Sequence, residues 1–107
     1  MSRFGMKTRE DFDKALQSFV EGCKVVYEAY KAKFCPGIPD KGWELTRGQK
    51  YVRIVHDGSA HSFVDMETGD VLKPAGWNKP AKHARGNIYD ENNGLKFMGP
   101  HGPAYLR

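Results

Sequence analysis

The stretch TREDFDKALQSFVEGCKVVYEAYKAKF, residues 8–34, determines the fold class of this chain. Its apolar side chains recur at steps of three or four residues, at Phe12, Leu16, Phe19, Cys23, Val26, Tyr30 and Phe34. This spacing places them along one face of an α-helix. Thr8 is suited to cap the start of the helix, with Asp11 three residues later completing a variant capping box. The helix ends at Cys35-Pro36, because a proline disfavours helical backbone in the residue before it.

A helix of about 26 residues would be about 39 Å long, which is long for a domain of 107 residues. The simplest interpretation is that the apolar stripe is the core-facing side of one helix. Two alternatives are a break near Gly22 and a stripe that partly faces a second subunit. The last alternative would make the protein a homodimer through its N-terminal helix.

Residues 36–50 form a connector rich in turn residues, in which Trp43 and Leu45 are suited to begin a strand. Residues 50–73 predict a three-stranded antiparallel meander, with strands at 51–56, 61–66 and 71–73 and four-residue turns between them. This arrangement sets Ile54 opposite Phe63, and Val52 opposite Asp65 and near Leu72, on the face that takes the helix. The opposite face is then mixed and holds Tyr51, Arg53, Val55, Ser62, Val64, Met66, Val71 and Lys73.

Residues 73–89, KPAGWNKPAKHARGNIY, predict an irregular loop, because two prolines and two glycines interrupt any regular element. Residues 87–98 predict a hairpin, and the Gly99–Pro103 segment is not expected to continue a strand. The expected fold is therefore α+β: one long N-terminal helix packed on a small antiparallel β-meander. A single domain, 1–107, is expected, with the helix at about 8–34, the sheet at about 43–73, the basic loop at 73–89, and the hairpin and tail at 87–107.

The charge of the chain is concentrated in that predicted loop. The formal net charge is +4, and residues 73–89 contain four basic and no acidic side chains, so the rest of the chain sums to zero. A localised excess of this kind indicates an anionic partner. The candidate nucleic-acid-binding residues are Lys73, Trp77, Lys79, Lys82, His83 and Arg85. Lysine and arginine neutralise phosphates, and an exposed Trp77 would stack on bases. The alternative is that Trp77 packs on the sheet while the lysines are only solvated.

Other chemical signatures are weak in this sequence. His56 and His61 flank a predicted turn and would suit zinc together with Asp57 or Asp65, but two exposed turn histidines are the simpler interpretation. Two cysteines are too few for a disulfide framework. On one helix, Cys23 and Cys35 would lie about 18 Å apart. No nucleophile elbow or phosphate-binding glycine motif is present. We therefore expect a non-enzymatic protein without a cofactor or a metal.

Residues 50–90 resemble a block found in short proteins encoded by tailed bacteriophages. The residues that carry the resemblance are Arg53–Val55, His61–Asp65, Thr68–Lys73 and Lys82–Ile88. The resemblance implies a phage gene product that acts inside an infected bacterium or is packaged in the virion. It implies no particular activity.

Location and partner follow from these features. No segment approaches the roughly 18 apolar residues of a membrane span, and the N-terminus lacks the apolar core of a signal peptide. The expected location is the host bacterial cytoplasm or the virion, away from membranes. The leading hypothesis is binding of DNA or RNA, mainly through phosphates. The alternatives are a module that binds a host protein or forms part of the virion, and capture of a small anionic nucleotide.

Overall fold

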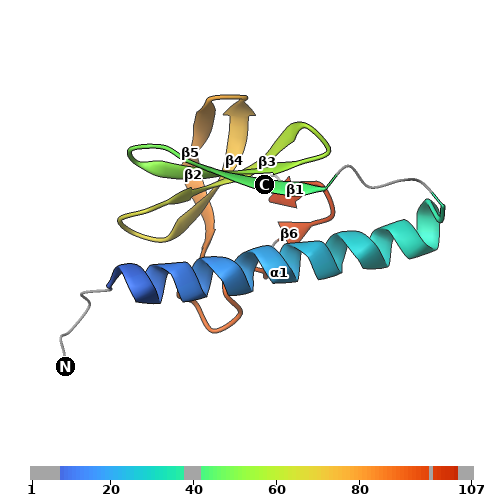
Figure 1. Cartoon of the computed structure of the whole chain (residues 1–107), viewed down its shortest axis with the longest axis horizontal. Coiled ribbons are helices and arrows are strands. Elements are labelled where there is room, and N and C mark those ends of the chain that lie inside the picture. The colour runs from blue at the N-terminus through green and yellow to red at the C-terminus, as the bar shows by residue number, and fades with distance from the viewer. Residues whose placement is uncertain (1–7, 38–41, 97, 104–107) are drawn as a thin grey trace.

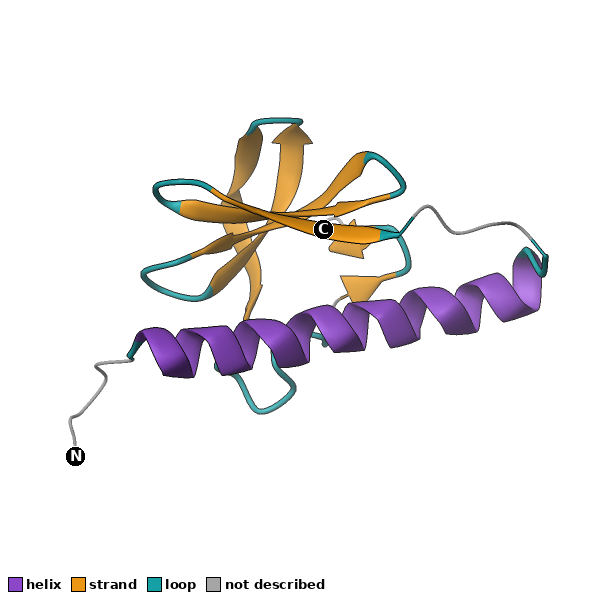
Figure 2. Cartoon of the chain, viewed as in Figure 1, coloured by secondary structure: helices purple, strands orange, loops and turns teal. Residues whose placement is uncertain are grey.

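The computed structural model describes residues 8–37, 42–96 and 98–103, and it has the α+β fold predicted from the sequence. One helix, α1 (Arg9–Phe34), lies along one face of a twisted antiparallel sheet (Figures 1 and 2). The sheet has the order β1-β2-β3-β4-β5, so that every strand pairs with its neighbours in sequence. Its strands are β1 (Trp43–Arg47), β2 (Tyr51–His56), β3 (Ser59–Asp65), β4 (Asp70–Gly76) and β5 (Lys79–Asn87). A short separate pair follows, β6 (Met98–Gly99) and β7 (Gly102–Pro103).

Helix α1 begins as its sequence predicts. The Thr8 hydroxyl accepts a hydrogen bond from the Asp11 backbone N–H at 3.0 Å, and the Asp11 carboxylate accepts one from the Thr8 N–H at 3.1 Å. The helix does not break at Gly22. A Cβ atom at that position would lie 2.2 Å from Leu95, so the glycine instead lets Leu95 pack closely against the helix. Within the described ranges, no helix has the length and apolar character needed to cross a membrane.

The apolar stripe of α1 is buried over its first half and leaves the sheet towards its end. Phe12, Leu16, Phe19 and Cys23 are all buried in the core. Farther along, Tyr27 takes the buried position, and Phe34 is 63% exposed. Figure 1 shows the reason: the C-terminal end of α1 extends beyond the sheet. Most of the stripe is therefore the core face of a single helix.

The register of the sheet differs by one residue from the expected one. Ile54 lies opposite Ser62 rather than Phe63, and Val52 lies opposite Val64. The turn is a tight two-residue one, Asp57-Gly58, in which both residues have positive φ, 53° and 78°. This turn is shorter than the expected one and so shifts the pairing of β2 with β3. An irregularity in the pairing beside Val55 offsets part of that register shift. The face towards α1 consequently consists of Val52, Ile54, Val64 and Val71, all fully buried.

The prediction of an irregular loop at 73–89 was wrong. Most of the segment forms the β4–β5 hairpin, whose two-residue tip is Trp77-Asn78. Pro74 pairs with Pro80, and the register shifts three times along the hairpin. Prolines are tolerated here because β5 is an edge strand and because bulged positions need no ladder hydrogen bond.

The expected hairpin at 87–98 was also wrong. Residues 88–96 form turns, and the strand pairing occurs later, in β6 and β7, mostly within the Gly99–Pro103 segment that was not expected to continue a strand. Gly102 makes this possible: its φ is +122°, and a Cβ atom there would meet the His61 carbonyl oxygen at 2.4 Å. Ile88, Leu95 and Met98 pack on the core from this side. The expected tail beyond residue 103 lies outside the described residues.

Candidate nucleic-acid interface

The six residues predicted to bind nucleic acid are distributed along the β4–β5 hairpin. Trp77 is at the tip, and Lys79, Lys82 and His83 follow on β5 with exposed side chains. Lys79 and Arg85 are six residues apart on β5, and because the strand is bulged they span about 15 Å. The cationic groups therefore form a line along the sheet edge rather than a compact cluster.

Besides Trp77, Lys73 and Arg85 also have structural contacts. The Lys73 ammonium donates to the Pro103 carbonyl at 3.4 Å, so it lies against the β6–β7 pair at the base of the hairpin. The Arg85 Nε–H donates to the His83 carbonyl at 3.3 Å and is only partly exposed. Trp77, Lys79, Lys82 and His83 thus form the exposed part of the predicted set.

The tip of the hairpin is held against the sheet by Arg53 of β2. The Arg53 guanidinium lies over the Trp77 ring, 4.2 Å from its centroid. Its Nη1 donates to the Trp77 carbonyl at 3.2 Å and to Asn78 Oδ1 at 2.6 Å. Trp77 nevertheless remains 47% exposed. The Trp77 ring therefore packs on the sheet through Arg53 and is also accessible.

A cleft of about 180 Å³ lies beside the tip, on the sheet face opposite α1. Lys50, Tyr51, Arg53, Phe63 and Asn78 contribute to its walls. The Tyr51 and Phe63 rings meet edge to face at 6.2 Å, and the Lys50 ammonium lies 5.4 Å from the centroid of the Tyr51 ring. The cleft thus combines cationic, aromatic and amide groups, a combination that suits a planar, hydrogen-bonding anion.

Sequence reasoning missed the contribution of β2 to this surface. Arg53 and Trp77 are 24 residues apart, and two-residue alternation along β2 placed Tyr51 and Arg53 on the outer face but gave them no role. The missing information was the path of the β4–β5 hairpin, which brings its tip over that face. A mixed face bearing an arginine and a tyrosine was the available signal.

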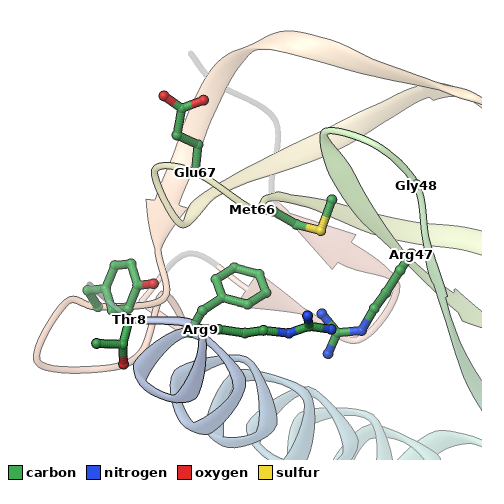
Figure 3. A pocket seen from close by; sticks show the side chains of 8 residues that line it. Thr8, Arg9, Arg47, Gly48, Met66 and Glu67 are labelled. Atoms are coloured by element: carbon green, nitrogen blue, oxygen red, sulfur yellow. The ribbon is translucent and has the colours of Figure 1, made fainter. Parts of the chain in front are cut away.

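A second, larger pocket of about 380 Å³ lies at the N-terminal end of α1. Figure 3 shows the guanidinium groups of Arg9 and Arg47 close to each other in this pocket, with Met66 above them and Glu67 pointing away. Arg47 Nη2 lies 3.0 Å from Asp13 Oδ1, so Asp13 neutralises part of the charge. This pocket is a weaker anion site than its two arginines suggest.

The histidines are not the exposed turn residues that the sequence suggested. His56 and His61 are buried, and the Trp43 ring stacks on His56 with a centroid distance of 4.1 Å. His101, from the turn between β6 and β7, lines the same small cavity. Burial lowers the pKa of His61 to about 4, with His56 and His101 adding repulsion of the charged form. The His61 Nδ1 lies 3.0 Å from Ser62 Oγ.

Asp57 and Asp65, the carboxylates considered as zinc ligands together with these histidines, make other contacts. Asp65 Oδ1 accepts hydrogen bonds from the backbone N–H groups of Glu67 and Thr68, at 2.8 and 3.1 Å, and so caps the β3–β4 turn. Asp57 lies in the β2–β3 turn, with Oδ2 3.5 Å from His56 Nε2. No group of three or more metal-ligating side chains occurs in the part of the chain that the structure describes.

The buried cysteine belongs to the core. Cys23 is fully buried under the sheet, and burial raises the pKa of its thiol to about 12. A thiol with so high a pKa is not a nucleophile at neutral pH. This agrees with its position on the apolar stripe of α1.

Comparison with known proteins gives a family but no activity. No curated protein sequence and no solved structure matches the chain significantly. Residues 6–101, most of the chain, match a family of unknown function, DUF7717. The match includes α1 and the five-stranded sheet, and therefore both the core and the β4–β5 hairpin. The protein is a member of the DUF7717 family.

Proposed function

We propose that this protein binds nucleic acid without catalysing a reaction, and that the β4–β5 hairpin contacts the phosphates. The observation that supports this most directly is the exposure of Lys79, Lys82 and His83 along one strand of a segment without acidic residues. Cations placed in this way release counterions from a phosphate backbone on binding. As the resemblance of residues 50–90 implies, the proposed setting is an infected bacterium.

The shape of the charged surface favours a polymer over a point ligand. Lys79 and Arg85 span about 15 Å of β5, which is longer than a single phosphate group. Lys50 and Arg53 extend the positive charge from the hairpin onto the sheet face, beside the cleft. A chain of phosphates would satisfy both parts of this surface together.

Charge and proline on β5 also have a structural consequence that is independent of binding. Lysines and prolines on an edge strand oppose pairing with a strand of another molecule. Lys79, Pro80 and Lys82 all lie on this edge. A test of the proposal must therefore change the sign of the charge and keep the edge charged.

The test is the double variant Lys79→Glu/Lys82→Glu, assayed by fluorescence anisotropy with labelled DNA and RNA at two salt concentrations. We expect affinity to fall roughly tenfold or more, and the slope of log K against log salt to decrease by about 1 to 2. The matched control is Lys14→Glu/Lys33→Glu, which makes the same change in net charge at exposed positions of α1. Equal losses of affinity in both double variants would mean that net charge alone causes the effect. Unchanged binding in Lys79→Glu/Lys82→Glu would refute the proposal.

A second candidate function is capture of a small anionic ligand at the Arg9–Arg47 pocket. The volume of about 380 Å³ lies within the roughly 300–1,000 Å³ typical of small-molecule sites. A panel of nucleotides in a thermal-shift assay tests it. Stabilisation that disappears in Arg9→Ser, and persists in the Lys79→Glu/Lys82→Glu variant, would favour this function over polymer binding.

A further inference from the structure

The tip of the β4–β5 hairpin presents an aromatic ring in a fixed position. The tip lies at the end of the molecule farthest from α1 (Figure 1). One side of the Trp77 indole faces the Arg53 guanidinium, and the side chain as a whole is about half exposed. One face of the ring is thus covered by Arg53, and the rest of the side chain is accessible.

Arg53 fixes the backbone of the tip as well as the ring. Its hydrogen bonds to the Trp77 carbonyl and the Asn78 side chain join β2 to a turn that is 24 residues later. A ring that is already positioned loses less conformational entropy when a ligand stacks on it. Arg53 is in this sense a positioning residue for Trp77.

The small volume of the adjoining cleft limits the size of the group that it can bind. Its volume of about 180 Å³ is below the roughly 300–1,000 Å³ of sites for whole small molecules. Tyr51, Asn78 and Lys50 are among the residues that line it. A single planar group with hydrogen-bonding edges fits this composition, and a neighbouring phosphate would lie near Lys50.

From these features we infer that the site takes single-stranded nucleic acid, with an unpaired base stacked on Trp77 beside the Lys50–Tyr51–Arg53 cleft. The inference rests on the proposed function and adds the class of substrate to it. In a duplex the faces of the bases are covered by their neighbours, so Trp77 would have nothing to stack on. Base stacking on aromatic side chains is the usual basis of sequence-tolerant single-strand binding.

The main alternative is insertion of the hairpin into the major groove of duplex DNA, which admits a two-stranded β-ribbon. A ribbon that enters a groove must project freely from its domain. Here the tip is tied to β2 by the Arg53 side chain. The geometry therefore favours the single strand.

The experiment compares a labelled single strand with the duplex of the same sequence by anisotropy at low salt, using wild type, Trp77→Ala, Trp77→Phe and Arg53→Lys. We expect at least tenfold tighter binding of the single strand. Trp77→Ala should weaken single-strand binding by about 5- to 100-fold and leave duplex binding nearly unchanged. Trp77→Phe, which keeps a ring, should retain most of the affinity.

Arg53→Lys separates positioning from charge, because it keeps the cation and loses the planar group that stacks and donates twice. We expect single-strand affinity to fall at an unchanged salt slope. Urea denaturation of each variant confirms that the loss does not come from unfolding.

The outcomes distinguish the inference from the proposed function. Equal binding of both forms, with no effect of Trp77→Ala, would overturn the single-strand inference and leave phosphate binding intact. Preference for the duplex would overturn it in favour of groove insertion. No binding of either form at low salt would overturn the proposed function, and the inference with it.

Discussion

The two faces of the five-stranded sheet use alternate residues of the same strands in opposite ways. On the face towards α1, Val52, Ile54, Val64 and Val71 are fully buried among the apolar side chains of the helix. On the opposite face, Arg53 contacts Trp77 at the hairpin tip, and Tyr51 and Arg53 border a cleft. One face is closed by a helix along its length, and the other is only partly covered by a hairpin tip. The first face therefore belongs to the hydrophobic core under α1, whereas the second keeps partly exposed groups that the proposed function would use.

The largest expected difference between the faces is in the cost of truncating a side chain. Ile54→Ala should destabilise the protein by about 4 kcal/mol, because the methyl groups leave a cavity in a closed core. Trp77→Ala should cost about 1 kcal/mol, since the ring is half exposed and its main loss is the contact with Arg53. Urea denaturation of the two variants measures both values.

Similar losses of stability in Ile54→Ala and Trp77→Ala would contradict this difference between the two faces. They would show that the outer face is a second core and that Trp77 mainly serves stability. Leu45→Ala is a suitable control, because Leu45 is a partly exposed side chain on the edge strand β1. It should cost less than either variant.

Low pH should lower the free energy of unfolding through His61, which lies where the β6–β7 pair contacts the sheet. The folded pKa of His61, about 4, is below its unfolded value of 6.5, so the unfolded chain binds more protons between these values. The contribution is complete above pH 6.5 and is lost as the pH falls towards 4, a total of about 3 kcal/mol. Denaturant midpoints measured from pH 7 to pH 4 test this. In His61→Gln the slope should flatten over this interval whatever the stability at pH 7, and an unchanged slope would assign it to other groups.

The smallest expected effect concerns the start of the helix that covers the first face. Thr8→Ala removes the hydroxyl that accepts from the Asp11 N–H, and should cost about 1 kcal/mol. Ser18→Ala, at an exposed position inside α1, should change stability by less than about 0.5 kcal/mol. Under conditions in which both variants are folded, nucleic-acid affinity should be unchanged. A loss of affinity in Thr8→Ala alone would link the helix end to the binding surface.

Local signals in the sequence predicted the helix and most of the strands. The apolar period of α1 and the Thr8–Asp11 capping box depend on residues within a few positions of one another, and they were confirmed. Alternation predicted β2 and β3, and Trp43 and Leu45 marked β1. The register failed because the Asp57-Gly58 pair makes a tighter turn than expected and the pairing beside Val55 is irregular. Neither feature changes the alternation that was used for the prediction.

The candidate site was only half predictable because it joins distant segments. The basic residues of 73–89 were visible as an excess of charge, but their arrangement as an edge hairpin was hidden by Pro74 and Pro80. The contact between Arg53 and Trp77 depends on the path of that hairpin over the sheet. His101 joins His56 and His61 only after the chain has folded back along the core. Such contacts leave no periodic trace in a sequence.

The strictly sequential order of the sheet has a consequence for how the protein folds during synthesis. Neighbouring strands are joined by short turns, so β1 to β5 can assemble from local hairpins with low contact order, which favours rapid folding. The helix is synthesised first, but Gly22 packs against Leu95, which is synthesised much later. His61 likewise packs against Gly102, near the end of the described chain. Until Ile88, Leu95 and Met98 have packed on the core, the apolar face of α1 remains incompletely covered.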